Sequence, residues 1–306
     1  MKILLTTLNS KFIHANLALR YLRGMGAEED ILLREYTIND RLEVIAGDIF
    51  QLAADVIGFS CYIWNITETL ELIDTLHQVS PETIIILGGP EVSYDPGEYL
   101  TRPGVDFVVF GEGEQTWREL LTVLRPEVPK RVISRERLSQ INGLAYRADG
   151  KPVINQPREL IKDLGTIPSP YLRLDGLENK IAYVESTRGC PFNCQYCLSS
   201  TFQGVRYFPL ERTKQELKQL IAAGVTQVKF VDRTFNCNKQ HALAIWRFLA
   251  AWHPAANFHF EISADLLDEE IISFLRQVPP GLFQFEIGVQ STNSQTLDSI
   301  RRKTNL

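Results

Sequence analysis

Short apolar segments and amphipathic helical segments alternate along the first 115 residues, and this alternation limits the folds open to the chain. Apolar runs of strand length occupy residues 2–6, 30–36, 55–62, 83–87 and 107–110, with helical periodicity at 15–23, 41–52 and 68–78. Continuous apolar strands that alternate with helices predict a parallel sheet covered on both faces. We therefore expect an α/β domain of the doubly wound, flavodoxin-like kind, whose ligand crevice lies beyond the carboxyl ends of its strands.

The alternation weakens between residues 126 and 178 and then resumes. Gly, Pro and turn residues are frequent in the weaker region, which we interpret as a linker with one small hairpin, residues 143–147 and 152–155. Further strands are predicted at 181–187, 227–232, 257–263 and 282–289, each followed by a helix, at 213–223, 239–251, 268–277 and 293–301. The expected organisation is an N-terminal domain over 1–125, the linker over 126–178 and four βα units over 179–306.

Composition excludes several classes of protein. A length of 306 residues, 44% hydrophobic and 23% charged, is typical of a globular chain of about two domains. The net charge of −5 argues against a nucleic-acid partner, because phosphate backbones bind basic surfaces. No apolar stretch reaches 18 residues and the N-terminus lacks the long apolar region of a signal peptide, so we expect a cytoplasmic protein with no membrane partner.

Three of the five cysteines fall within eight residues, at Cys190, Cys194 and Cys197. The spacing C-x3-C-x2-C follows a predicted strand, so one loop can place three thiolates around a small metal centre. Iron–sulfur clusters are held by cysteine thiolates, normally four, and a missing fourth ligand leaves one iron open. The alternatives are a chance cluster and a structural zinc site with Cys237 as fourth ligand, although zinc ligands usually come in two close pairs. We interpret Cys237 as a structural thiol.

The local sequence, with Tyr196 before the last cysteine, resembles the radical S-adenosylmethionine (radical SAM) superfamily. The resemblance implies that Cys190, Cys194 and Cys197 ligate a [4Fe–4S] cluster whose fourth iron is chelated by SAM. Electron transfer then cleaves SAM to methionine and a 5′-deoxyadenosyl radical. It also implies that Tyr196 lies near the adenine, as a cofactor-binding residue, although an ordinary aromatic packed on the loop is the alternative.

Two further segments, 230–236 (FVDRTFN) and 286–291 (EIGVQS), resemble motifs of the cobalamin-associated branch of this superfamily. Both lie at carboxyl ends of predicted barrel strands, where barrel enzymes place their working residues. The resemblance makes three carboxylates candidate catalytic residues and one amide a candidate cofactor contact: Asp232, Glu261, Glu286 and Gln290. The alternative for each carboxylate taken alone is a solvated or salt-bridged residue of the barrel, without a catalytic role.

The N-terminal domain resembles the cobalamin-binding domain that usually precedes the barrel in this branch. The matching stretches follow the third, fourth and fifth predicted strands, and their glycines let the backbone approach a ligand closely. The candidate cofactor-binding residues are Ser60, Gly88, Gly89, Pro90, Gly111, Glu112 and Gly113. The D-x-H-x-x-G motif is absent, which implies a corrinoid without a protein histidine on its lower face, and we interpret His14 as a loop residue. A dinucleotide is disfavoured because no G-x-G-x-x-G follows the first strand.

The resemblance implies a partial barrel of six βα units, whereas we count four in this sequence. We therefore expect either a truncated chain or a second chain that completes the barrel. In both cases we expect this chain alone to bind SAM with weakened affinity. The expected function is that of a radical SAM enzyme with cobalamin as second cofactor, acting on an unidentified small molecule by methyl transfer, cyclisation or oxidation. Flavodoxin or ferredoxin is the expected reductant. The alternatives are a non-catalytic corrinoid- or partner-binding module with a vestigial or zinc-filled cysteine loop, and a flavin protein. A methylthiotransferase is disfavoured because its N-terminal domain carries three cysteines, whereas this one has only Cys61.

Overall fold

The computed structural model describes residues 1–125, 133–201 and 204–302. The chain divides into two compact units. The first unit comprises Met1–Ile161 and Ile167–Gly176, and the second comprises Lys162–Thr166 and Leu177–Leu306. None of the helices in the described residues is both long enough and apolar enough to span a membrane.

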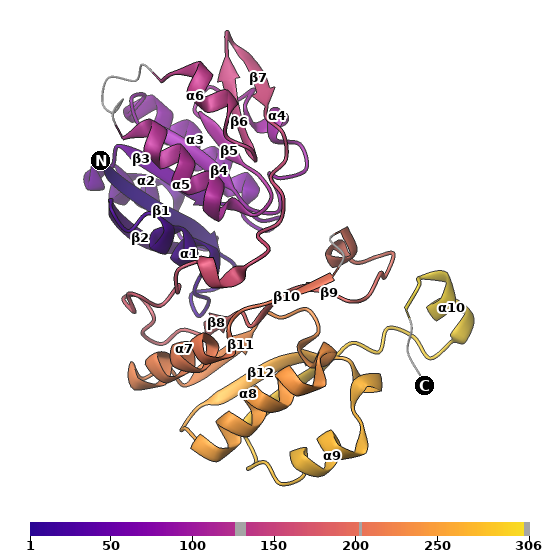
Figure 1. The fold of residues 1–306 in the computed structure, drawn as a ribbon. Coiled ribbons are helices and arrows are strands. Elements are labelled where there is room, and N and C mark those ends of the chain that lie inside the picture. The colour runs from indigo at the N-terminus through magenta and orange to yellow at the C-terminus, as the bar shows by residue number, and fades with distance from the viewer. Residues whose placement is uncertain (126–132, 202–203, 303–306) are drawn as a thin grey trace. The chain divides into compact units, whose positions relative to one another are not determined.

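The first unit is built on one twisted sheet, drawn in indigo to magenta in Figure 1. Its first five strands are parallel and adjoin in the order β2-β1-β3-β4-β5. This is the flavodoxin-like order of doubly wound folds, which confirms the predicted fold class. The strands are β1 (Lys2–Asn9), β2 (Asp30–Thr37), β3 (Val56–Ser60), β4 (Ile84–Gly88) and β5 (Phe107–Val109).

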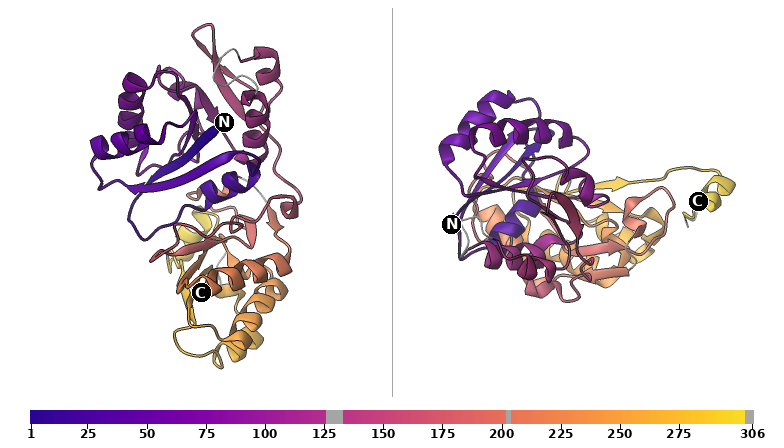
Figure 2. Two further views of the ribbon diagram at one scale, coloured as in Figure 1. Left: turned by 90° about the vertical axis from the view of Figure 1, so that its left-hand side faces the viewer. Right: turned by 90° about the horizontal axis from the view of Figure 1, so that it is seen from above.

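Helices cover both faces of this sheet (Figures 1 and 2). One apolar core lies between the sheet and the helices α2 and α3, and a second core lies between the opposite face and α1, α5 and α6. The strands are apolar on both sides because both faces are covered, which is why they read as continuous hydrophobic runs. The helices are α1 (Leu17–Met25), α2 (Leu42–Leu52), α3 (Ile66–Val79), α4 (Pro96–Tyr99), α5 (Gly113–Leu124) and α6 (Arg135–Ser139).

The predicted hairpin belongs to this sheet rather than to a separate linker. It consists of β6 (Leu144–Ala148) and β7 (Lys151–Ile154), and β6 pairs antiparallel with β5. The edge of β5 would otherwise present unpaired backbone groups, and the hairpin covers it. The interpretation of 126–178 as a linker is therefore corrected: its described residues up to Ile161 are part of the first unit, and residues 126–132 lie outside the described residues.

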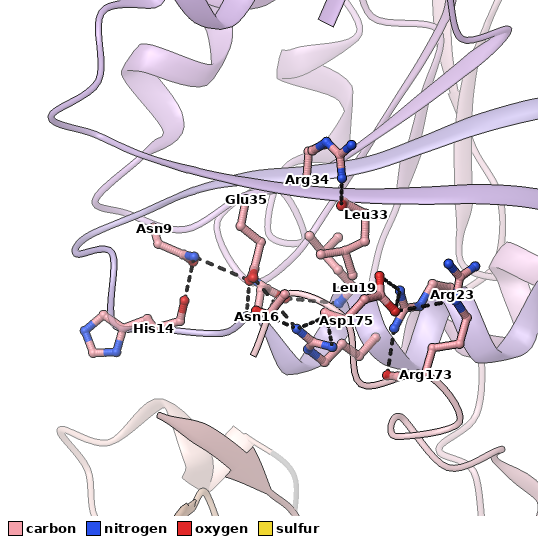
Figure 3. A network of polar contacts seen from close by, with 12 residues as sticks. Asn9, His14, Asn16, Leu19, Arg23, Leu33, Arg34, Glu35, Arg173 and Asp175 are labelled. Carbon is pink, nitrogen blue, oxygen red and sulfur yellow. Dashed lines mark hydrogen bonds and ion pairs between the residues drawn. The ribbon is translucent and has the colours of Figure 1, made fainter. Parts of the chain in front are cut away.

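The segment Ile167–Gly176 also belongs to the first unit, where two arginines of α1 hold it (Figure 3). Arg23 donates from Nη1 to both carboxylate oxygens of Asp175, at 3.0 and 2.9 Å. Arg20, which is buried, donates to the carbonyl oxygens of Asp175 and Gly176 at 3.2 and 3.3 Å. Burial lowers the pKa of Arg23, and the adjacent Asp175 carboxylate opposes that shift.

The second unit contains four parallel strands in the order β13-β12-β11-β8, each followed by a helix (Figure 1). These are the four βα units predicted from the sequence. The strands are β8 (Ala182–Val184), β11 (Gln227–Phe230), β12 (Asn257–Ile262) and β13 (Phe283–Ile287); the helices are α7 (Leu210–Ala222), α8 (Lys239–Trp252), α9 (Glu269–Leu275) and α10 (Ser294–Ser299). A separate antiparallel hairpin, β9 (Thr187–Cys190) and β10 (Gly204–Tyr207), lies between β8 and α7 in the sequence.

The two faces of the second sheet differ in character because successive side chains of a strand point to opposite sides. One face packs an aromatic core on α8, where the Trp246 ring lies 5.9 Å from the ring of Phe260 and 5.7 Å from that of Phe285. The other face carries polar side chains, among them Lys229, Glu261 and Glu286. In a barrel of βα units, this second face is the inner wall.

Candidate functional site

The cysteine loop begins at the end of β9. Cys190 and Cys194 are buried and Cys197 is half-buried. Within the loop, the amide of Cys197 donates to the carbonyl of Cys194 at 3.1 Å, which closes a turn between these two cysteines. The structure thus places the three predicted ligands on one short, internally hydrogen-bonded segment.

A glycine lets the strand that leads into this loop pair closely with β10. Gly189 has φ +99°, and a Cβ there would lie 2.1 Å from the carbonyl oxygen of Gly204. A side chain at Gly189 would therefore separate the two strands. The close pairing of β9 with β10 therefore explains the glycine before Cys190, without reference to a metal.

Three thiols on one loop are a donor set that suits a [4Fe–4S] cluster. In the part of the chain that the structure describes, no three His, Cys, Asp or Glu side chains converge closely enough to hold one metal ion. A structural zinc needs four ligands about 2.0–2.3 Å from one atom. In a [4Fe–4S] cluster each thiolate binds a different iron, so three spaced thiols suit it and leave one iron without a protein ligand. Cys237 lies outside this loop, in the turn after β11, and its sulfur is 3.9 Å from the hydroxyl of Tyr207.

Arg302, which the sequence analysis did not single out, lies beside the cysteine loop. Its Nη1 is 4.0 Å from the sulfur of Cys194 and 3.4 Å from the hydroxyl of Tyr196, and its Nη2 donates to the carbonyl of Gly288 at 2.7 Å. Its Nε is buried without a hydrogen-bond partner among the described residues. In the sequence, Arg302 is one of three consecutive basic residues and carries no motif. Only its position in the fold distinguishes it from its two neighbours. The guanidinium places a positive charge and an unused donor at the cysteine loop.

Asp232 does not lie where a catalytic carboxylate would meet a substrate. Its side chain is 0% exposed. It accepts hydrogen bonds from the amide and hydroxyl of Ser186, at 3.0 and 2.7 Å, and from the hydroxyl of Thr187 at 2.6 Å. Burial raises the pKa of Asp232, and these hydrogen bonds partly oppose the shift. The expectation of a catalytic role for Asp232 is corrected, because its oxygens are occupied inside the fold.

Glu261 and Glu286 come together on the inner wall, as neighbours in the β12–β13 register. Lys229 lies between them, with its Nζ 3.4 Å from an oxygen of each. His259 places its Nε2 3.2 Å from the carboxylate of Glu286. Burial lowers the pKa of His259, and the charge of Lys229 lowers it further. Lys229 and His259 were missed in the sequence because isolated polar residues inside strands carry no motif.

The remaining candidates of the second unit are exposed. Tyr196 lies in the cysteine loop, where burial of part of its ring raises its pKa. Gln290 follows β13 with φ +66°, and its side chain folds back over Gly288, where a Cβ would meet Gln290 Nε2 at 2.7 Å. Both residues therefore lie near Arg302, which contacts Tyr196 directly and Gly288 through its carbonyl.

The predicted glycine stretches of the first unit lie at the carboxyl edge of its sheet, and two are conformationally special. Gly89 has φ +118°, and a Cβ there would lie 2.4 Å from the carbonyl oxygen of Cys61. Gly111 has φ +76° and faces open space. Pro90 is exposed, whereas Gly88 and Gly113 are half-buried. Gly89 is therefore needed for the close approach of its own chain to Cys61, whereas Gly111 leaves its backbone open to a ligand.

Two of the predicted cofactor-binding residues of the first unit are instead used inside the fold. Ser60 is buried, and its hydroxyl accepts from the side-chain amide of Asn16 at 3.3 Å. Glu112 accepts from the backbone amide of Ile161 at 2.8 Å. Both side chains thus hold neighbouring segments in place, and their contact with a cofactor stays a prediction.

Exposed apolar side chains gather at the same edge and were not predicted. Phe12 and Ile13 follow β1, Ile63 and Trp64 follow β3, and Tyr94 follows β4. Ile63 is 78% exposed, and Trp64 stacks on Tyr62 with ring centroids 4.4 Å apart. Large apolar groups that share one edge mark a binding surface. The flat face of a large ring can pack on exposed apolar side chains of this kind. His14, which the sequence predicts to be a loop residue, follows Phe12 and Ile13 after β1. Its carbonyl oxygen accepts a hydrogen bond from the side-chain amide of Asn9 (Figure 3).

Comparisons with known proteins agree with both units. Residues 3–121 match the B12 binding domain and residues 184–306 match the radical SAM superfamily. The chain is 32% identical over 245 residues to an uncharacterized methyltransferase of Pyrococcus horikoshii, covering 75% of this chain and 51% of that protein. It is 27% identical over 276 residues to the cobalamin-dependent radical SAM methyltransferase TokK of Streptomyces tokunonensis, covering 81% and 38%.

The fold is also known from solved structures. The structure of the radical SAM methyltransferase TsrM of Kitasatospora setae, solved with cobalamin and a [4Fe–4S] cluster, matches with a TM-score of 0.77 at 17% identity, over 100% of this chain and 63% of that one. The chain spans about half the length, or less, of the two curated relatives described above. It consists of a B12-binding domain followed by a radical SAM domain, and it belongs to the radical SAM superfamily.

Proposed function

We propose that this chain binds a [4Fe–4S] cluster, SAM and cobalamin, and that it takes part in the methylation of a small molecule. The observation that carries the proposal is the cysteine loop, which places three thiols on one segment beside the cation of Arg302. The methyltransferases among its relatives support methyl transfer over cyclisation or oxidation.

In this proposal the cofactors supply the difficult chemistry and the protein supplies position and charge. When bound, the cluster supplies an electron that cleaves SAM to a 5′-deoxyadenosyl radical, and cobalamin supplies the methyl group. Cys190, Cys194 and Cys197 would hold the cluster, and without a fourth cysteine in the loop it would remain open to SAM. The guanidinium of Arg302, whose Nη1 lies beside Cys194 and Tyr196, would place its positive charge near the carboxylate of SAM.

The inner wall orients the remainder of SAM and the substrate. Glu261 and Glu286 are held by Lys229, so their free oxygens face the interior and can accept from hydroxyl or ammonium groups. Tyr196 and Gln290 complete the contacts, the first against the adenine. In the first unit, the apolar residues after β1, β3 and β4 would pack against the corrin ring, and the exposed Pro90 and Gly111 would let the backbone approach it.

The test is anaerobic reconstitution of the whole chain with iron and sulfide, followed by metal analysis and EPR spectra with and without SAM. About four irons per chain, together with a reduced signal that changes on addition of SAM, are expected. Cys194→Ala should lose the cluster, whereas the matched variant Cys237→Ala should keep it.

Cobalamin binding is tested separately, by titration of hydroxocobalamin and equilibrium dialysis. Ile63→Ser, on the exposed edge, should weaken retention, and Val44→Ser, which is exposed on α2, should not. One zinc per chain without acid-labile sulfide would contradict the proposal. It would favour a non-catalytic module with a zinc-filled cysteine loop.

A further inference from the structure

A buried carboxylate ties the start of the cysteine strand to the neighbouring strand. Asp232 follows β11, and its two oxygens accept from Ser186 and Thr187 at 2.6 to 3.0 Å. Ser186 directly precedes β9, and Thr187 is its first residue. Three donors converge on one fully buried acceptor, so the start of β9 is fixed relative to the end of β11.

The same turn also meets the far end of β9. Thr234, two residues after Asp232, places its hydroxyl 3.6 Å from the sulfur of Cys190. Cys190 lies three residues beyond Thr187, a span of about 10 Å in an extended strand. One short turn after β11 therefore touches β9 at both ends, at Thr187 and at Cys190.

A second layer supports this arrangement from α8. The Nε2 of His241 lies 3.0 Å from the hydroxyl of Ser186. The ring of Tyr207, opposite Thr187 in the β9–β10 register, lies edge-on to His241 with centroids 5.1 Å apart. The acceptor of the network is Asp232, and the other members supply donors and packing.

We propose that Asp232 is a positioning residue that preorganises the cysteine loop by fixing β9, and thereby Cys190. That the loop holds a [4Fe–4S] cluster rests on the proposed function; that Asp232 fixes β9 does not. Without the carboxylate, the amide of Ser186 loses its acceptor inside the fold, and the three hydrogen bonds that tie the start of β9 to the turn after β11 are lost. Cys190 then loses its fixed place, and a cluster held by three thiols depends strongly on each of them.

The experiment compares Asp232→Ala with Asn236→Ala. Asn236 is a matched control because, like Asp232, it is a buried polar residue of the same turn. Its side chain bonds the backbone of Ser263, at 2.8 and 2.9 Å, and therefore anchors the end of β12 rather than β9. The first measurement is amide hydrogen exchange of the iron-free chain. Asp232→Ala should accelerate exchange at Thr187–Cys190, and Asn236→Ala should accelerate it around Ser263 and leave Thr187–Cys190 as in the wild type.

The second measurement is the rate at which a chelator removes iron from the reconstituted chain without oxygen. Asp232→Ala should release iron about 10-fold faster than the wild type, the lower end of the affinity lost when a residue that orients a metal ligand is removed. Asn236→Ala should release it at close to the wild-type rate, and Asp232→Asn, which keeps one acceptor oxygen, should fall between.

The outcomes separate the two proposals. If the wild type assembles no cluster, the proposed function fails, and the exchange pattern alone decides whether Asp232 fixes β9. If the wild type assembles a cluster but both alanine variants release iron at the same rate, the positioning role is overturned. Unchanged exchange at Thr187–Cys190 in Asp232→Ala would overturn it as well.

Discussion

Gly189→Ala should open the hairpin that carries the cysteine loop. Two effects add at this position. A residue with a side chain at φ +99° is strained by about 1–3 kcal/mol. In addition, the new Cβ would lie 2.1 Å from the backbone oxygen of Gly204, so β9 and β10 must separate, at a cost typical of overpacking, about 1–3 kcal/mol more.

The matched control is Gly204→Ala, in the facing strand. Gly204 has a similar backbone, φ +91°, but among the described residues no atom lies within 4 Å of its Cβ position. It should therefore show the backbone strain alone, about 1–3 kcal/mol. The difference between the two variants isolates the clash, because both glycines belong to the same hairpin.

The assay is amide exchange across β9 and β10 of the iron-free chain, with urea unfolding of the second unit as a check on stability. Gly189→Ala should raise exchange throughout the hairpin, and Gly204→Ala should raise it less. The reasoning would be refuted if Gly189→Ala were no more destabilising than Gly204→Ala, since the close approach of the two backbones would then carry no cost.

Three further predictions concern other parts of the chain. Arg302→Ala should weaken SAM binding to the reconstituted chain about tenfold, which is the effect of one lost charge-assisted hydrogen bond. Arg301→Ala, at an exposed neighbouring arginine, should leave SAM binding unchanged. Equal effects of the two variants in equilibrium dialysis would contradict the role of Arg302 in SAM binding. Trp246→Ala should destabilise the second unit by about 3–5 kcal/mol in urea unfolding, whereas Trp246→Phe should cost much less, because the buried indole N–H has no partner among the described residues. Burial alone would raise the pKa of Asp175, but the charge and hydrogen bonds of Arg23 outweigh it and the pKa is lowered. The ion pair therefore stabilises the folded segment fully above the ordinary carboxyl pKa, and this stabilisation is lost as the pH falls through the lowered pKa. Proteolysis within Ile167–Gly176 should increase in that acidic range, and Asp175→Asn should show the increase already at neutral pH.

The parallel strands were predictable because their burial leaves a direct mark on the sequence. A strand such as β4, covered on both faces, has no polar position, and its run of isoleucines is easily recognised. The cysteine loop was predictable for a similar reason, since its ligands are close in sequence. The hairpin β6–β7 was recognised as a hairpin, but its place beside β5 was not, because pairing to an open edge depends on which strand lies there.

Asp232 shows the limit of prediction at the site itself. Its motif identified the residue, but a carboxylate at a strand end reads the same whether it faces a substrate or three donors of its own chain. The structure decides between them through burial and through Ser186 and Thr187. Lys229 and Arg302 carried no sequence signal, because their partners lie on other strands or loops.

The sequence by itself determined the two α/β units, their strands and the three cysteines that share one loop, because each of these depends on residues that are neighbours along the chain. Tertiary structure alone decided that Ser60, Glu112 and Asp232 serve the fold, and that Lys229 joins Glu261 to Glu286. The physical reason is that a polar group's role depends on its burial and on the donors and acceptors around it. These come from segments distant in the sequence, and only folding brings them together.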